Sequence, residues 1–165
     1  PMVFLADVPG FMVGERVEHE LMLHWGMRMM HALQNSSTPT LTVCIRKAFG
    51  LAWQAMNGSL MPALGVYSWP GAEIGFMDPE VGVNVAFGSK LARIEEPEER
   101  ESERLALVQE VGESTNPYEA AGTMRIDEII DPGDTRSVLA NDLEMLAHRN
   151  VPPPEARPLS YWPTC

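Results

Sequence analysis

The sequence predicts an α/β fold whose strands are mostly parallel. Short apolar runs rich in β-branched residues recur along the chain, and longer segments with helical spacing of apolar residues separate them. The length of 165 residues fits one domain, and a hydrophobic content of 45% is enough for a packed core. We find no internal repeat.

The first third of the chain predicts strand, helix and strand. Residues 2–6 form an apolar run that a turn ends, and a loop over 10–14 follows. Apolar positions three and four residues apart predict a helix from about 16 to 33, with Gly26 on its apolar face. Residues 40–45 predict a second buried strand that ends at Arg46-Lys47.

The middle of the chain predicts a glycine turn and a helix, followed by further short elements. Gly50 directly precedes residues 51–56, which favour a helix. Residues 66–69 and 72–77 predict two short strands. Asp78-Pro79-Glu80 has the order of an N-cap, a first-turn proline and a first-turn acid, so we expect a helix to about Gly88.

The last third predicts a polar helix, one more strand and a tail. Residues 93–104 carry many glutamates and arginines and predict a solvated helix, and Asn116-Pro117 starts another short one. Residues 126–130 predict a strand, and a helix follows from about 136 to 148. We expect one domain over residues 1–150 and an extended Pro-rich tail over 151–165.

Charge and composition argue against several partners. The formal net charge of −11 disfavours nucleic acid and anionic membrane surfaces. The longest uncharged stretch, residues 48–72, contains too many glycines and prolines for a membrane-spanning helix. Two cysteines, Cys44 and Cys165, give no disulfide framework, and we expect a cytoplasmic location.

The sequence favours no metal site and lacks common nucleotide-binding motifs. Neither a dinucleotide-binding glycine motif nor a P-loop is present. His19 and His24 are five residues apart, which on a helix separates the rings by roughly 140°. His24 and His31 share a helix face, but two histidines at this spacing are more often packing or surface residues than metal ligands.

The junction from Arg46 to Gln54 is the most informative segment. A sharp glycine turn into a helix leaves the first backbone N–H groups unpaired and directs them at one point, which suits a developing negative oxygen. The amides of Leu51 and Ala52 would then form an oxyanion hole. The alternative is a plain strand-to-helix turn in which Gly50 only relieves strain, and spacing alone favours that alternative.

Four segments resemble consecutive motifs of one family, the carboxyltransferase subunit of biotin-dependent acyl-CoA carboxylases of the propionyl-CoA carboxylase beta-chain group. The resemblance implies a crotonase/ClpP-like spiral of β-β-α units. It covers nearly the whole chain but only the later part of a two-domain subunit, so we expect an incomplete C-terminal carboxyltransferase domain that lacks its start. The four segments are PMVFLADVPGF (1–11), TVCIRKAFG (42–50), WPGAEIGFM (69–77) and IIDPGDTRSVL (129–139).

The resemblance also implies a reaction and a site. The expected activity is transfer of a carboxyl group from carboxybiotin to a short-chain acyl-CoA of the propionyl or acetyl type. Biotin itself acts as the base, so no catalytic triad or metal is expected. Gln54 matches a position associated with acyl-chain choice. The site residues implied are Gly50 with the amides of Leu51 and Ala52 for biotin, and Trp53, Gln54, Gly10 and Phe11 for the substrate.

Departures from the family pattern leave alternatives open. Leu51 stands where the family has a second glycine and Gln54 where it has an acid, and Asp78 follows Met77 in place of glycine. The alternatives are a non-catalytic paralogue whose biotin pocket Leu51 blocks, and a biotin-dependent acyl-CoA decarboxylase.

The implied partners are acyl-CoA, a biotin carboxylase with its biotin carrier, and further copies of the subunit, as a hexamer built from three dimers. Met22, Met29 and Met30 and the stretch 51–69 also offer more apolar surface than so short a chain covers readily, which favours an oligomer. The family places the protein in the cytoplasm, or in the mitochondrial matrix of a eukaryote.

Overall fold

The computed structural model describes residues 1–147, so the expected tail over 151–165 lies outside the described residues. Five strands form one sheet in which every pair is parallel, which confirms the expected strand direction. Four of them lie side by side in the order β1-β2-β3-β5, and β4 pairs with the end of β2. The strands are β1 (Met2–Val8), β2 (Thr40–Phe49), β3 (Gly65–Ser68), β4 (Glu73–Gly75) and β5 (Glu128–Ile129).

Strand β2 is the centre of the sheet and is longer than the sequence indicated. Its first half pairs with β1 and β3, and Lys47 to Phe49 pair with β4. The expected end at Arg46-Lys47 is therefore wrong, because pairing with β4 keeps the backbone extended as far as Phe49. The added residues bring the strand directly to the Gly50 turn.

Two helices occupy the segment where one was expected. Helix α1 (Glu15–His19) ends before Leu21, and α2 (Met22–Gln34) begins after it. Leu21 has φ 58°, a left-handed conformation that a right-handed helix cannot continue through, so the continuous helix over 16–33 is wrong. Met29, expected on the buried face, is 40% exposed.

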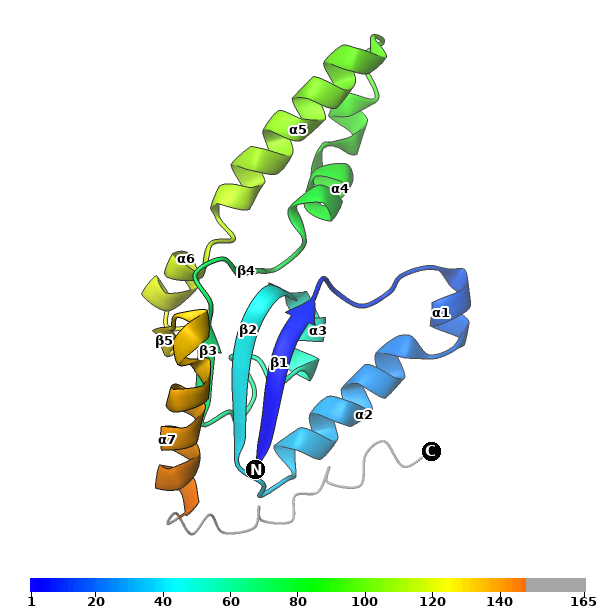
Figure 1. Cartoon of the computed structure of the whole chain (residues 1–165). Coiled ribbons are helices and arrows are strands. Elements are labelled where there is room, and N and C mark those ends of the chain that lie inside the picture. Colours follow the sequence, from blue (N-terminus) through cyan, green and yellow to red (C-terminus); the bar gives the residue numbers. More distant parts are fainter. Residues whose placement is uncertain (148–165) are drawn as a thin grey trace.

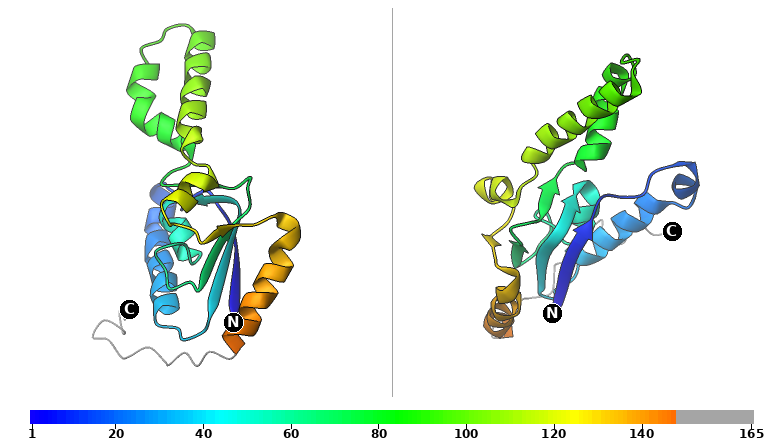
Figure 2. Two further views of the ribbon diagram at one scale, coloured as in Figure 1. Left: turned by 90° about the vertical axis from the view of Figure 1, so that its left-hand side faces the viewer. Right: turned by 45° about the horizontal axis from the view of Figure 1, so that its top comes forward.

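The sheet is covered on both faces, as Figures 1 and 2 show. Helices α2 and α3 (Gly50–Ala55) lie on one side, where Trp53 joins Cys44 and Ala48 in the core. Helix α7 (Thr135–Ala147) lies on the other and packs its leucines on Leu41 and Val43 of β2. The Tyr67 hydroxyl of β3 donates a hydrogen bond to Asp142 of α7.

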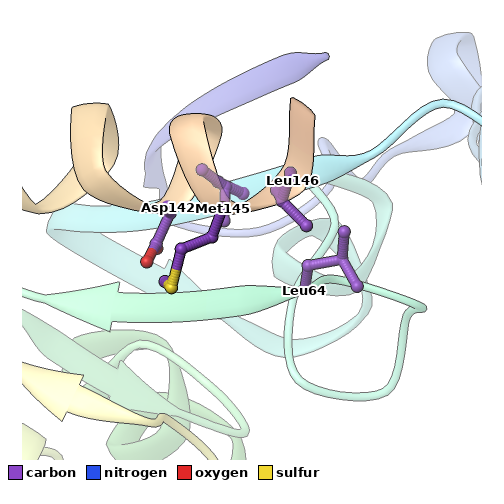
Figure 3. A pocket seen from close by; sticks show the side chains of 5 residues that line it. Leu64, Asp142, Met145 and Leu146 are labelled. Carbon is purple, nitrogen blue, oxygen red and sulfur yellow. The ribbon is translucent and has the colours of Figure 1, made fainter. Parts of the chain in front are cut away.

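A small cavity of about 220 Å³ remains beside α7 (Figure 3). Leu64, Met145 and Leu146 make its wall largely apolar. Asp142 also lines it, and this carboxylate is already bound by Tyr67. The cavity is therefore a gap in the packing of α7 on the sheet.

A helical hairpin projects away from the sheet (Figure 1). It consists of α4 (Pro79–Leu91) and α5 (Pro97–Glu113), which share a small core around Val83 and Leu107. The helix expected over 93–104 is displaced, because it starts at Pro97, a residue suited to a first helical turn, and continues to Glu113. Its charged face is solvated, as expected.

The chain then returns to the sheet through α6 (Pro117–Gly122), β5 and a short 3₁₀ helix, η1 (Pro132–Asp134). The expected caps are confirmed: Asn116 accepts from the Glu119 amide at 3.0 Å and Asp78 from the Glu80 amide at 3.1 Å. The strand expected over 126–130 is shorter, since Asp127 binds the Val66 amide through its side chain. Within residues 1–147, no helix is long and apolar enough to cross a membrane.

Candidate functional site

The candidate site is built around the sharp turn at Gly50, between β2 and α3. Phe49 is still extended, with φ −115° and ψ 135°, whereas Gly50 has φ 58°. A Cβ built on Gly50 would lie 2.8 Å from the carbonyl oxygen of Phe76, a backbone atom. Both the left-handed conformation and this approach require glycine. Pairing of Phe49 with Gly75 in β4 brings Phe76 to this place.

The amides of Leu51 and Ala52 belong to the first turn of α3. Amides at this place have no carbonyl partner within their own helix, so they can bind an external acceptor. The side chain of Ala52 is buried, whereas that of Leu51 is 41% exposed. The sharp glycine turn into a helix is thus confirmed as a structural feature.

A cavity of about 360 Å³ opens beside this turn, a volume within the usual range of small-molecule sites. Three of the expected site residues after Gly50 line it: Leu51, Trp53 and Gln54. The lining also contains the exposed side chains of Leu60 and Phe76. The full lining is Gly50, Leu51, Trp53, Gln54, Ser59, Leu60, Gly75, Phe76 and Arg125.

Gln54 is buried in this wall, with 8% of its surface exposed. Its Oε1 accepts a hydrogen bond from the Leu60 amide at 2.9 Å. Gly58 packs against Gln54 Oε1 and the carbonyl oxygen of Trp53, where a Cβ would approach to 3.0 and 2.9 Å. Gln54 therefore holds the loop after α3 in place and is not a solvent-facing residue.

Trp53 is buried beside Cys44 of β2. Burial raises the pKa of the Cys44 thiol to about 12, and the nearby Trp53 side chain lowers it only in part. A thiol with such a pKa is not a nucleophile at neutral pH. Cys44 thus packs in the core with Trp53 of α3 and takes no part in the chemistry of the cavity.

Gly10 and Phe11 lie away from the lining of this cavity. They belong to the loop between β1 and α1, where Gly10 has φ 144°. The Phe11 ring packs on Gly26 of α2, so closely that a Cβ on Gly26 would meet it at 2.5 Å. The glycine expected on the apolar face of this helix therefore makes room for Phe11.

An ion pair ties the same end of β2 to the projecting hairpin. Lys47 Nζ lies 2.5 Å from Asp78 Oδ2, and the other carboxylate oxygen of Asp78 caps α4. The hydrogen bond that Lys47 donates to Asp78 raises the pKa of Lys47 above its ordinary value. On the exposed side, Arg46 pairs with Asp7 of β1 at 3.0 Å and lowers the pKa of that carboxyl group.

Five lining residues of this cavity were not among the expected site residues: Ser59, Leu60, Gly75, Phe76 and Arg125. Phe76 is 86% exposed although it is aromatic, and Arg125 reaches the cavity from the turn after α6. Phe76 and Arg125 are far from Gly50 along the chain, so no local spacing connects them with the turn. For Phe76 the available signal was its place in the segment WPGAEIGFM (69–77), and for Arg125 it was an arginine in an acidic chain. Among residues 1–147, no cluster of three or more His, Cys, Asp or Glu side chains could hold a metal ion.

Comparisons with known proteins agree with the resemblance. The family described as carboxyl transferase domain matches residues 1–158. The propionyl-CoA carboxylase carboxyltransferase subunit of Haloferax mediterranei is 35% identical over 157 residues, 95% of this chain and 30% of that protein. The methylmalonyl-CoA carboxyltransferase 12S subunit of Propionibacterium freudenreichii subsp. shermanii is 37% identical over 147 residues, 89% of this chain and 28% of that protein.

A decarboxylase and a solved structure are also similar. The methylmalonyl-CoA decarboxylase subunit alpha of Veillonella parvula is 33% identical over 149 residues, 90% of this chain and 27% of that protein. The crystal structure of a transcarboxylase 12S hexamer with methylmalonyl-coenzyme A and methylmalonic acid bound superposes with a TM-score of 0.78, at 35% identity, over 94% of this chain and 29% of that one. The expected crotonase-type α/β fold is confirmed, and the chain spans under a third of the length of these relatives.

Proposed function

Because this chain belongs to the carboxyl transferase domain family, we propose that it forms the biotin-binding part of a carboxyltransferase that acts on a short-chain acyl-CoA of the propionyl or acetyl type. The cavity at the Gly50 turn is the observation that carries this proposal. It combines unpaired helix-start amides with a volume suited to a small ligand.

The residues at the turn fit the ureido group of biotin. Gly50 allows the chain to turn sharply, and the amides of Leu51 and Ala52 donate to the ureido oxygen as negative charge develops on it. Carboxylated biotin bound at this turn would supply the carboxyl group, and its ureido nitrogen would take up the α-proton of the acyl-CoA in exchange. This chain therefore needs to supply oxyanion stabilisation and positioning rather than a side-chain base.

The remaining expected residues have distinct parts in the proposal. Trp53 and Gln54 line the cavity, and Gln54 would face the acyl chain with the amide nitrogen that Leu60 does not use. Gly10 and Phe11 follow β1, whose end pairs with Ala48 near the end of β2. Loops that follow neighbouring parallel strands leave the same edge of a sheet, so the two residues can contact acyl-CoA from beside the cavity.

Leu51 does not fill the cavity, because the space of about 360 Å³ exists with the leucine in place. This supports the enzyme over a paralogue with a blocked pocket. The similarity to a methylmalonyl-CoA decarboxylase subunit supports decarboxylation as the second candidate function. The two reactions use the same biotin site and differ in the direction of carboxyl transfer, so turnover of propionyl-CoA against methylmalonyl-CoA separates them.

We further propose that residues 1–150 are the later part of a longer carboxyltransferase subunit, followed by the tail at 151–165. The partners would be acyl-CoA and a biotin carboxylase with its biotin carrier, and the assembly a hexamer of three dimers. Exposed apolar residues on α2, Trp25 and Met29 among them, support assembly into an oligomer. We expect a cytoplasmic location, or the mitochondrial matrix in a eukaryote.

The test is carboxyl transfer by the full-length subunit that contains this chain. The subunit is assayed with carboxylated biotin carrier and acetyl-, propionyl- and longer acyl-CoA, and its mass is measured by light scattering. Transfer to a short acyl-CoA supports the proposal. Biotin that fails to bind, in an assay with avidin as competitor, would indicate a non-catalytic paralogue instead. The 165-residue chain alone is expected to be inactive.

A further inference from the structure

A second cavity adjoins the one at the Gly50 turn, and the side chain of Arg125 lines both. The second cavity also has a volume of about 360 Å³, and it shares Gly75, Phe76 and Arg125 with the first. Arg125 is the only charged residue in the lining of either cavity. The rest of the second lining is Met77, Gly82, Val111, Ser114 and Thr115.

Arg125 is held in place by its backbone. Its amide donates to the Ala120 carbonyl at 2.8 Å, and the next residue, Ile126, is buried in the main core. Met124 before it has φ 57°, so the chain turns sharply at this point. The half-buried side chain is therefore presented to both cavities from a fixed turn rather than from a loose loop.

The guanidinium group keeps most of its hydrogen-bonding capacity. Its Nε donates to Thr123 Oγ1 at 3.1 Å, and within residues 1–147 the side chain makes no other hydrogen bond and no ion pair. Asp127, the acid closest to it in sequence, is bound to the Val66 amide. The four terminal N–H groups of Arg125 are thus available to a ligand.

The polar groups around Arg125 favour an acceptor. Gln54 lines the first cavity and uses its Oε1 to accept from Leu60, and within residues 1–147 its amide nitrogen makes no hydrogen bond and remains a donor. No carboxylate lines either cavity to compete for the guanidinium group. A planar guanidinium group in a largely apolar wall binds a carboxylate with two parallel hydrogen bonds.

We propose that Arg125 is a specificity-determining residue that binds a carboxylate of the acyl-CoA in this site. The inference rests on the proposed function and adds to it the class of ligand, an acyl-CoA that carries a carboxylate. That carboxylate has two possible sources. It is either the transferred group, as on methylmalonyl-CoA, or a second carboxylate at the end of the acyl chain, as on glutaryl-CoA.

The experiment uses equilibrium binding to the full-length subunit without biotin, measured by calorimetry. Two ligand pairs differ mainly by one carboxylate: methylmalonyl-CoA with propionyl-CoA, and glutaryl-CoA with pentanoyl-CoA. The variants are Arg125→Gln and Arg125→Lys, and Arg93→Gln is the control because this exposed arginine lies outside both cavities. Thermal unfolding checks that each variant is folded.

We expect Arg125→Gln to weaken binding of the carboxylate-bearing member of one pair by tenfold or more and to leave its uncharged partner unchanged. Arg125→Lys should restore part of the preference, and Arg93→Gln should have no effect. The pair that responds identifies the source of the carboxylate. If the wild type binds acyl-CoA but neither preference changes in Arg125→Gln, this inference alone is wrong. A wild type that binds no acyl-CoA would contradict the proposed function as well.

Discussion

The carbonyl oxygen of Phe76 lies 2.8 Å from the point where a side chain on Gly50 would begin. This contact joins the end of β4 to the turn between β2 and α3, and it places Phe76 on the wall of the cavity. The same contact makes Gly50 sensitive to the smallest substitution. Alanine would need both a left-handed backbone and a displacement of β4.

We therefore expect Gly50→Ala to destabilise the protein by about 2 kcal/mol or more. Two effects contribute: the left-handed conformation of residue 50 and the clash of the added Cβ with the Phe76 carbonyl oxygen. Carboxyl transfer by the full-length subunit should fall with it. Gly88→Ala is the matched control, because Gly88 lies within α4 with nothing within 4 Å of an added Cβ. Alanine there should be neutral or stabilising. Chemical denaturation of both variants measures the difference, and equal effects would contradict the argument.

The Lys47–Asp78 pair predicts a pH dependence. The pKa of Lys47 is raised above 10.5 by Asp78, so the folded protein holds this proton more tightly than the unfolded chain. The stability from the pair is fully present below pH 10.5 and is lost as pH rises through the raised pKa. Asp78→Asn keeps an N-cap acceptor for the Glu80 amide but removes the charge.

Asp78→Asn should therefore cost about 1 kcal/mol near neutral pH and almost nothing well above the pKa of Lys47. The measurement is the difference in free energy of unfolding between wild type and variant across alkaline pH. Because other groups that titrate in this range contribute equally to both proteins, their contributions to the free energy of unfolding cancel in the difference. A cost that stays constant with pH would mean that the charge of Asp78 acts on the start of α4 and not through its pair with Lys47.

Tyr67 fixes α7 on the sheet through its hydrogen bond to Asp142. Burial and this bond raise the pKa of Tyr67, so the unfolded chain loses the hydroxyl proton first and stability falls as pH rises above about 10. We expect Tyr67→Phe to cost about 1 kcal/mol, or roughly 2–4 °C in Tm, and to speed amide exchange in α7. Unchanged exchange in α7 would show that its leucines alone hold it.

The sequence predicted what is local and missed what the fold assembles. The Gly50 turn and the caps at Asp78 and Asn116 follow from residue types within a few positions, the parallel strands follow from the alternation of short strands with helices, and the structure has all of them. The break at Leu21 was missed because nothing in the sequence marks a leucine for a left-handed conformation. Arg125 was missed for another reason, since only the fold brings it to the same cavity as Gln54.

Gln54 allows the sharpest test of the acyl pocket. Gln54→Glu keeps the length of the side chain and an oxygen that accepts from the Leu60 amide, so the loop after α3 should stay in place. It also adds a negative charge to a cavity whose one charged group is Arg125. The new carboxylate would pair with Arg125 and repel a carboxylate on the ligand. Gln54→Leu, which cannot accept from Leu60, should instead lose about 1–3 kcal/mol of stability.

We expect Gln54→Glu to change the ratio of the dissociation constants of methylmalonyl-CoA and propionyl-CoA by tenfold or more, in favour of propionyl-CoA, which corresponds to about 1.4 kcal/mol of differential binding. The double variant with Arg125→Gln distinguishes pairing from simple repulsion. If the new charge acts by occupying Arg125, the two changes will not be additive, because each removes the same contact. If the ratio stays unchanged while Gln54→Leu unfolds more readily, Gln54 supports the loop and does not choose the acyl chain.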